Sequence, residues 1–124
     1  MDRARFAENP ILQKSLDFSK AVWFFVKRFK HSHHLVLTRQ LLRASTSIGA
    51  NCMEAQNAES KADFIHKLKL AAKEAEEAQY WLMILESDPE FEGVDELAGQ
   101  LDEVQRLLTS IIASSKRGTR VTDS

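Results

Sequence analysis

Hydrophobic side chains recur along this chain at alternating intervals of four and three residues, the spacing that places them on one face of an α-helix. The first series begins just after Asn9 and Pro10. This pair is typical of a helix start, because Asn caps the first turn and Pro needs no backbone donor there. The series consists of Ile11, Ser15, Phe18, Val22, Phe25 and Phe29. It predicts a helix over residues 10–31.

Three further series predict three further helices. The second helix is expected over residues 34–58, with its seam at Leu37, Leu41, Ala44, Ile48, Asn51 and Ala55. The third is expected over residues 61–87, where Ser60 and Asp63 form a capping box and the seam follows at Phe64, Leu68, Ala71, Ala75, Ala78, Leu82 and Leu85. The fourth is expected over residues 94–116, with Leu97, Leu101, Val104, Leu108, Ile111 and Ser115 on its seam.

Four amphipathic helices joined by short connections are typical of an antiparallel up-down-up-down four-helix bundle. We therefore predict an all-α fold with one bundle domain over residues 10–115, an N-terminal arm at 1–9 and a flexible polar tail at 116–124. Only four Gly and two Pro occur in 124 residues, which favours long helices over strands and turns. Gly49 is the exception inside a helix. It costs about 1 kcal/mol relative to Ala and so indicates a packing or backbone requirement.

The first predicted helix carries more apolar surface than one bundle needs. A second stripe, formed by Leu12, Leu16, Ser19, Trp23 and Val26, runs beside the first seam, and Phe24 lies on the remaining face. A helix that is apolar nearly all round requires neighbours on more than one side. We therefore expect a homo-oligomer, with interface candidates at Leu16, Trp23, Val26 and Trp81.

Charge divides the chain into two halves although its net charge is only −1. Residues 1–50 hold nine Lys and Arg against three Asp and Glu, whereas residues 51–124 hold eight against fifteen. One interpretation is pairing between a basic and an acidic helical hairpin, which the small net charge favours. The other is a basic surface for nucleic acid, with contacts from Lys20, Lys27, Arg28, Lys30, Arg39 and Arg43.

The candidate chemistry is sparse. Cys52, the single cysteine, lies among small apolar residues and is expected to be a buried thiol in a reducing compartment. His31, His33 and His34 could bind a metal, but no carboxylate or Cys follows at ligand spacing, so a solvated turn is the preferred interpretation. Bundle di-metal enzymes need two acid-x-x-His motifs, and only one is present, over residues 63–66. We predict no enzyme activity, no cofactor and no metal.

No signal peptide is expected, because the charged N-terminus leads into no apolar segment. The longest strongly apolar run covers residues 21–26, far short of the ~20 residues that a membrane span needs. The sequence therefore predicts a cytoplasmic protein with no membrane partner.

A polar row follows one face of the second predicted helix at spacings of four, four and three: Arg43, Ser47, Asn51 and Glu54. Asn51 also falls on the apolar seam, where burial without partners would cost about 1–3 kcal/mol. Glu74 and Glu77 on the third helix offer charged partners. We interpret Arg43, Ser47, Asn51, Glu54 and Glu77 as a polar network that sets helix register, the alternative being a ligand groove.

The segment 40–55, QLLRASTSIGANCMEA, resembles the hallmark of the four helix bundle protein family, approximately Q-L-x-R-A-x-x-S-I-x-x-N-I-A-E-G. The matching residues are Arg43, Ala44, Ser47, Ile48, Asn51 and Glu54, with Phe64, Leu68, Ala71, Ala72 and Glu77 downstream. The chain departs from the pattern at Ala55, where Gly is usual, and at residues 73–74, where Lys-Glu replaces Gly-Ser.

That family includes proteins encoded in intervening sequences of bacterial large-subunit ribosomal RNA genes, and retroelement accessory variability proteins share its fold. The resemblance implies a barrel-like homopentamer with a central channel. The retroelement proteins engage a reverse transcriptase and nucleic acid through a strongly basic surface, which this chain lacks. We expect a non-enzymatic oligomeric scaffold or adaptor with no small-molecule substrate. The alternative is a nucleic-acid-binding accessory protein that acts with ribosomal RNA or a reverse transcriptase.

Overall fold

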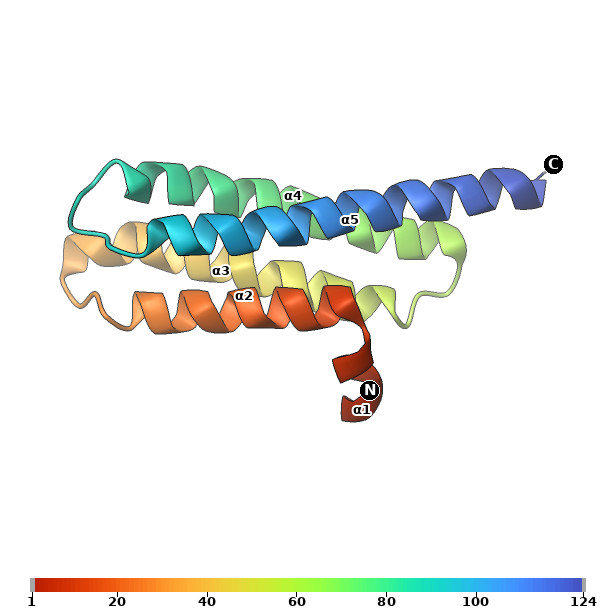
Figure 1. Cartoon of the computed structure of the whole chain (residues 1–124), viewed down its shortest axis with the longest axis horizontal. Coiled ribbons are helices and arrows are strands. Elements are labelled where there is room, and N and C mark those ends of the chain that lie inside the picture. The colour runs from red at the N-terminus through yellow and green to blue at the C-terminus, as the bar shows by residue number, and fades with distance from the viewer. Residues whose placement is uncertain (1, 124) are drawn as a thin grey trace.

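The computed structural model describes residues 2–123, with side chains throughout that range except at position 32 and positions 119–123. Over this range the fold is all-α, as predicted. The elements are α1 (Arg3–Glu8), α2 (Pro10–Val26), α3 (Ser32–Ala55), α4 (Lys61–Glu86) and α5 (Val94–Asp123). The four long helices run alternately up and down, and α1 turns away from the start of α2 (Figure 1).

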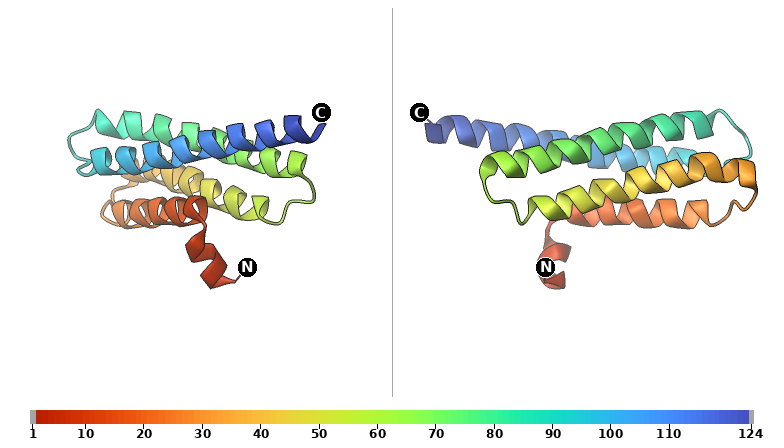
Figure 2. Two further views of the ribbon diagram at one scale, coloured as in Figure 1. Left: turned by 45° about the vertical axis from the view of Figure 1, so that its right-hand side comes forward. Right: turned by 180° about the vertical axis from the view of Figure 1, so that it is seen from behind.

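Each long helix packs against the next, and α5 returns to pack against α2 and so closes the bundle (Figure 2). No contact joins α2 to α4 or α3 to α5 within the described residues, so these pairs occupy diagonal corners. The α3–α4 pairing is the most extensive. No described helix is long and apolar enough to cross a membrane.

The helix starts agree with the capping residues in the sequence. The Asn9 side chain accepts a hydrogen bond from the Leu12 amide at the start of α2. At the start of α4, Ser60 Oγ accepts from the Asp63 amide at 3.0 Å, and the Asp63 carboxylate accepts from the Glu59 amide. Such reciprocal bonds satisfy amides that have no partner inside the helix.

The helix ends differ from the expected bounds. The predicted first helix continues to residue 31, whereas α2 ends at Val26. The chain leaves the helix there, and the Phe29 ring packs on Phe25 and on Phe91 of the α4–α5 connection, at centroid distances of 5.0 and 4.7 Å. These aromatic contacts close one end of the core. At the termini, the arm contains α1, which Asp2 caps, and α5 extends well beyond residue 116.

The core lies along the predicted seams. Ile11, Phe18 and Val22 of α2 are buried, with Phe18 among the largest fully buried side chains. The facing parts of α3 and α4 carry small side chains: Ala44, Ala71, Ala75 and Ala78 are fully buried. Small side chains allow two helix backbones to approach closely, and the bulky Leu residues fill the space toward the ends.

Small polar residues also line the contact between α2 and α3. Ser15 and Ser45 are buried, and Ser19 Oγ donates to the Ser45 carbonyl at 3.1 Å. Cys52 is fully buried in the same region. Burial raises the pKa of its thiol to about 12, so the reactive thiolate is absent near neutral pH. Cys52 is therefore a core residue, as its sequence surroundings predicted.

Gly49 does not meet the packing requirement expected of it. A Cβ atom at this position would lie 3.6 Å from Ser15 Oγ, an ordinary van der Waals contact. Its φ angle is not positive, since Gly93 is the residue with that conformation among those described. Neither space nor backbone geometry demands glycine at position 49.

Gly49→Ala should therefore raise the free energy of unfolding by about 0.5–1 kcal/mol, because Ala is the better helix former and nothing obstructs its methyl group. Urea denaturation at fixed protein concentration measures this. The matched control is Gly99→Ala in α5, where an added Cβ meets no atom within 4 Å and a similar gain is expected. Destabilisation at 49 alone would mean that the α2–α3 contact requires glycine.

Candidate functional site

The polar row on α3 meets acidic side chains of α4. Arg43 Nη1 donates to Glu74 at 3.3 Å, and Arg43 Nη2 donates to Glu77. The bond from Arg43 holds the pKa of Glu77 below its ordinary value, and the same bond raises the pKa of Arg43. All three side chains keep substantial contact with solvent. The arrangement joins two helices but encloses no ligand cavity.

The remaining residues of the row take different positions. Glu54 pairs with Lys67 of α4 at 3.1 Å, a second exposed link between α3 and α4. Asn51 is half-buried and donates to the Ser47 carbonyl of its own helix. The structure therefore brings Arg43 and Glu77 together, whereas Glu54 and Asn51 lie outside that cluster. Ser47 contributes a backbone carbonyl to the row.

Some of these ion pairs join the basic half of the chain to the acidic half, as the first interpretation of the charge pattern predicts. The Arg43 contacts join a basic-half residue to the acidic half, and Lys14 of α2 pairs with Glu103 of α5 at 3.2 Å. Exposed pairs of this kind contribute little stability, about 0–1 kcal/mol each. Lys20 of α2 and the basic residues directly after this helix, Lys27, Arg28 and Lys30, remain outside such ion pairs, so intramolecular pairing accounts for only part of the charge pattern.

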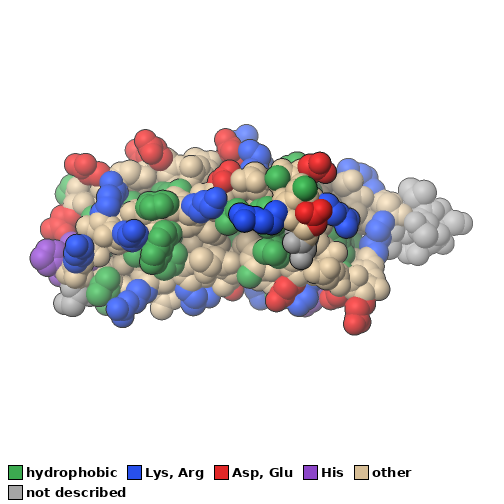
Figure 3. All heavy atoms as spheres, turned by 90° about the horizontal axis from the view of Figure 1, so that it is seen from below, with side chains coloured by type: hydrophobic (Ala, Val, Ile, Leu, Met, Phe, Trp, Pro, Cys, Tyr) green, Lys and Arg blue, Asp and Glu red, His purple; other side chains and the backbone are tan. Residues whose placement is uncertain are grey.

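An apolar and basic surface covers the outer side of α2. Trp23 is 48% exposed and Phe24 is 62% exposed. Lys27 Nζ lies 5.7 Å from the Trp23 ring centroid and 5.5 Å from that of Phe24. Seen from this side, hydrophobic patches alternate with Lys and Arg side chains (Figure 3). We call the surface formed by Leu16, Lys20, Trp23, Phe24 and Lys27 the α2 face.

Two shallow hollows adjoin the α2 face. The first has a volume of about 510 Å³ between α2 and α3 and is lined by Ser19, Trp23, Arg39, Leu42, Arg43 and Thr46. The second, of about 410 Å³, lies beside α1 and is lined by Arg3, Phe6, Ala7, Gln13, Leu16, Lys20 and Met53. Apolar side chains at the floor and cations at the rim suit a protein partner better than a small polar ligand.

A second apolar surface lies at the diagonal corner of the bundle, on α4. Tyr80 and Met83 are each 60% exposed, one helical turn apart and flanked by exposed Glu76 and Glu86. We call these four residues the α4 face. Sequence reasoning counted Phe24 in the excess apolar surface of the first helix but missed Tyr80 and Met83 as surface residues. An apolar residue outside a seam is not by itself distinguishable from one that packs on a neighbouring helix.

The other interface candidates are less exposed. Val26 and Trp81 are partly buried against the core. Trp81 Nε1 is buried and has no hydrogen-bond partner within the described chain. Of the four predicted interface residues, Trp23 therefore presents the largest exposed ring.

The six basic residues proposed for nucleic acid fall into two groups. Arg28 donates to the Glu92 carbonyl and stacks against Phe25 and Phe29, and Arg43 is held by its acidic partners. The other four, Lys20, Lys27, Lys30 and Arg39, are exposed on α2, on the turn after it and on α3. These four present cations to solvent without a described hydrogen bond or ion pair.

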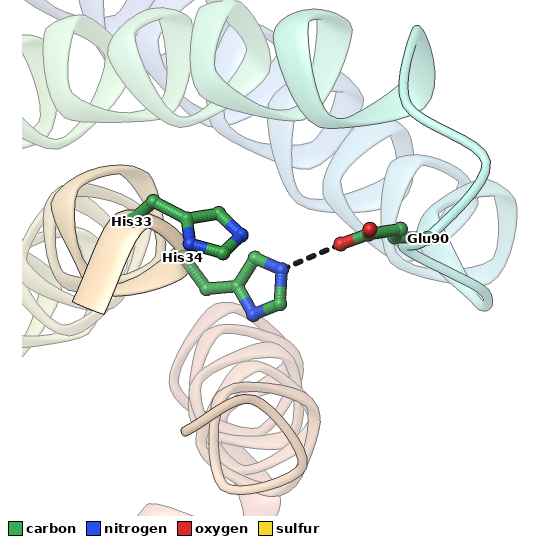
Figure 4. A group of neighbouring side chains, drawn as sticks. All are labelled: His33, His34 and Glu90. Carbon is green, nitrogen blue, oxygen red and sulfur yellow. Dashed lines mark hydrogen bonds and ion pairs between the residues drawn. The ribbon is translucent and has the colours of Figure 1, made fainter. Parts of the chain in front are cut away.

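The histidine turn is joined by a carboxylate from a distant segment. His33 and His34 lie in the first turn of α3, and His34 Nε2 is 2.6 Å from Glu90 Oε2 in the α4–α5 connection (Figure 4). Sequence reasoning missed Glu90 because it lies 56 residues from His34 and no local spacing relates the two. His66 of the acid-x-x-His motif is exposed on α4.

The family is decided by comparison with known proteins. Residues 7–110 match the sequence profile of the 23S rRNA-intervening sequence protein family. The chain belongs to the family of 23S rRNA-intervening sequence proteins. It is similar to a protein of unknown function from the S23 ribosomal protein family of Bacteroides thetaiotaomicron VPI-5482, whose crystal structure is known. The two are 38% identical, with a TM-score of 0.77, over 82% of this chain and 97% of that one.

The family match and the similar crystal structure confirm the family resemblance found over residues 40–55. A comparison with curated proteins finds no match. Family membership assigns no molecular activity to the chain.

Glu77→Gln should lower the free energy of unfolding at pH 7 by about 0.2–1 kcal/mol. Because the folded pKa of Glu77 lies below its unfolded value, its contribution is fully present above the ordinary pKa of ~4.3 and is lost as the pH falls through the folded pKa. The difference between variant and wild type should therefore vanish in acid. Urea denaturation at several pH values measures it.

The matched control is Glu8→Gln, at an exposed position of α1 that forms no ion pair among the described residues. It should change stability little at any pH. A pH-independent loss in Glu77→Gln would contradict an electrostatic contribution.

Proposed function

We propose that this chain is a non-enzymatic subunit of a homo-oligomeric scaffold or adaptor. The α2 face of one subunit packs on the α4 face of the next. The single observation that carries this proposal is the exposure of Trp23 and Phe24 on a helix that is already apolar on its core side. An aromatic side chain buries about 150–250 Å², so covering the exposed half of Trp23 alone is worth about 2–3 kcal/mol.

Two features favour contact between unlike faces. The α2 face and the α4 face occupy diagonal corners, since α2 and α4 make no mutual contact, and both lie in the half of the bundle nearer the α2–α3 connection (Figure 1). The α2 face carries Lys20 and Lys27, whereas residues 74–86 contain acids and no Lys or Arg. Apolar patches with opposite charge at opposite corners complement each other.

Contacts between unlike faces build closed rings when the rotation between neighbours closes. A ring with an odd number of subunits requires them, because a self-complementary contact pairs subunits two by two. The family resemblance suggests five subunits. We propose a homopentamer on that ground.

A scaffold role without catalysis fits the chemistry of the described residues. The Cys52 thiol is buried and protonated near neutral pH. The acid and base groups of the polar row are committed to Arg43–Glu74 and Arg43–Glu77 contacts. Neither set adjoins an enclosed cavity in which water is excluded from a substrate, the condition that strengthens catalytic electrostatics.

The wild-type protein should elute as an assembly of about five times the 14.1 kDa subunit mass, measured by light scattering coupled to size-exclusion chromatography. Trp23→Glu and Tyr80→Glu should each give monomers, because each places a charge in one of the two contacting faces. The control Ala98→Glu adds the same charge at an exposed position of α5 and should leave the assembly intact.

Mixing the two defective variants tests the contact between unlike faces. Trp23→Glu keeps its α4 face and Tyr80→Glu keeps its α2 face, so an equimolar mixture at high concentration should form one-to-one dimers. A mixture that remains monomeric would mean that the two faces do not contact each other. A wild-type monomer would overturn the scaffold proposal altogether.

A nucleic-acid-binding role is the second candidate. Lys20, Lys27, Lys30 and Arg39 are exposed, and Lys27 lies over the exposed rings of Trp23 and Phe24. Cations interleaved with aromatic rings suit single-stranded RNA, whose bases stack on the rings while phosphates meet the cations. The family name links these proteins to 23S rRNA, which makes RNA the appropriate probe.

If this role is correct, a fluorescent single-stranded RNA of mixed sequence should bind at low salt, with log affinity falling linearly as log salt rises. The double variant Lys27→Glu/Lys30→Glu should abolish the anisotropy change. The control Lys69→Glu/Lys73→Glu makes the same charge change at exposed positions of α4 and should bind normally. Equal losses in both variants would indicate a net-charge effect without a site.

A further inference from the structure

At the end of the bundle that holds the α2–α3 connection, two imidazoles and a carboxylate converge. Ring nitrogens of His33 and His34 and a carboxylate oxygen of Glu90 all lie within 4.8 Å of one another. The three side chains point toward a common space between α3 and the α4–α5 connection (Figure 4). We propose that His33, His34 and Glu90 bind a divalent transition-metal ion, with Zn²⁺ as the best fit.

The donor set favours such an ion. Neutral imidazole and carboxylate are ordinary Zn²⁺ ligands, with bonds of about 2.0–2.2 Å, which place tetrahedral ligand atoms about 3.4 Å apart. The donor atoms lie within 4.8 Å of one another, and the exposed side chains of His33 and Glu90 have room to adjust toward that separation. Water completes the coordination. Hard ions such as Mg²⁺ prefer oxygen ligands and fit less well.

His34 provides the fixed point of the site. It is only 7% exposed, and its ring makes edge contacts with Phe29 and Phe91, at centroid distances of 5.6 and 5.1 Å. The Thr38 hydroxyl donates to the His34 carbonyl. A ligand held by packing loses little freedom on binding, which increases affinity.

The contact between His34 and Glu90 already brings two of the three donors together. His34 Nε2 lies 2.6 Å from Glu90 Oε2, and His34 Nδ1 is buried without a hydrogen-bond partner among the described residues. The pair bridges α3 and the α4–α5 connection at the position where the ion would bind.

Acidic residues near the site offset the one electrostatic effect that opposes a bound cation. That effect comes from the N-terminus of α3, which carries the positive end of the helix dipole. The α4–α5 connection offsets it with Asp88, Glu90 and Glu92. Asp88 also accepts a hydrogen bond from the Glu90 amide at 2.9 Å, which holds the Glu90 backbone in place.

Zn²⁺ would therefore tie the first turn of α3 to the α4–α5 connection, two segments joined otherwise by aromatic packing. Binding to the folded state alone raises its stability in proportion to the logarithm of the ion concentration above Kd. It should also weaken at acidic pH, because the imidazoles must lose their protons.

The test uses the untagged full chain after removal of metal with a chelator, titrated with Zn²⁺ alone by calorimetry at neutral pH. One ion per chain is expected, with a rise in Tm. His33→Ala and Glu90→Gln should each lower affinity at least about tenfold, since even substitution of a residue that only supports a ligand costs about 10–100-fold. His34 is left unchanged, because its burial couples substitution to folding.

The matched control is His66→Ala, an exposed histidine on α4 outside this cluster, and it should bind Zn²⁺ as the wild type does. A second readout, the histidine imidazole NMR signals, should show shifts at His33 and His34 and none at His66. Repeating the titration on Trp23→Glu should give the same affinity, which separates this site from the proposed assembly.

Three outcomes would overturn the proposal. One is the absence of saturable binding, which would leave His34 and Glu90 as a hydrogen-bonded pair without a metal. Another is unchanged affinity in both His33→Ala and Glu90→Gln. The third is loss of binding in His31→Ala with none in Glu90→Gln, which would assign the ion to the histidine turn without the carboxylate.

Discussion

The close packing of small side chains on both sides of α3 determines where the other features of this protein lie. Ala44 of α3 and Ala71, Ala75 and Ala78 of α4 are fully buried, and Ser19 of α2 donates to the Ser45 carbonyl of α3. With so little side-chain volume between the helices, the backbones approach closely, and the remaining bulk must lie at the ends or on the outside. The polar row begins on α3, two of the three residues of the histidine cluster lie in its first turn, and the exposed aromatics lie on the neighbouring α2.

The distribution of charged side chains over the surface follows from the same arrangement of helices. Because α3 lies between α2 and α4, its Arg43 reaches the carboxylates of α4, and the two halves of the chain neutralise each other along that edge. On α2, Lys14 pairs with Glu103 of α5, whereas Lys20 and Lys27 form no ion pair among the described residues and remain available. A near-neutral chain thus presents a locally basic, aromatic face. The proposed second subunit and the proposed RNA would both use this face, so the two proposals predict competition for it.

Aromatic side chains close the end of the bundle that holds the α2–α3 connection. They are Phe25, Phe29 and Phe91, and His34 packs against them. The buried His34 imidazole faces the exposed Glu90 carboxylate there, and this pair forms the centre of the proposed Zn²⁺ site. The proposed Zn²⁺ site and the proposed assembly therefore lie on separate parts of the surface and make independent demands on the chain.

The sequence by itself determined the elements that depend on local spacing. The seams, the Asn9 and Ser60 caps and the motif over residues 40–55 specified an all-α fold, four long helices and the family, because helix periodicity and capping involve residues within a few positions of one another. The burial of Cys52 followed from the same periodicity. These features needed no knowledge of how the helices pack.

Only the tertiary structure decided what depends on distant segments. It ended α2 at Val26 so that Phe29 could pack on Phe91, separated Glu54 from the Arg43 cluster, and removed the need for glycine at position 49. It also brought Glu90 to His34 across 56 positions. Helix pairing sets such contacts, and a single sequence carries no local signal for the side chain that a neighbouring helix or connection will present.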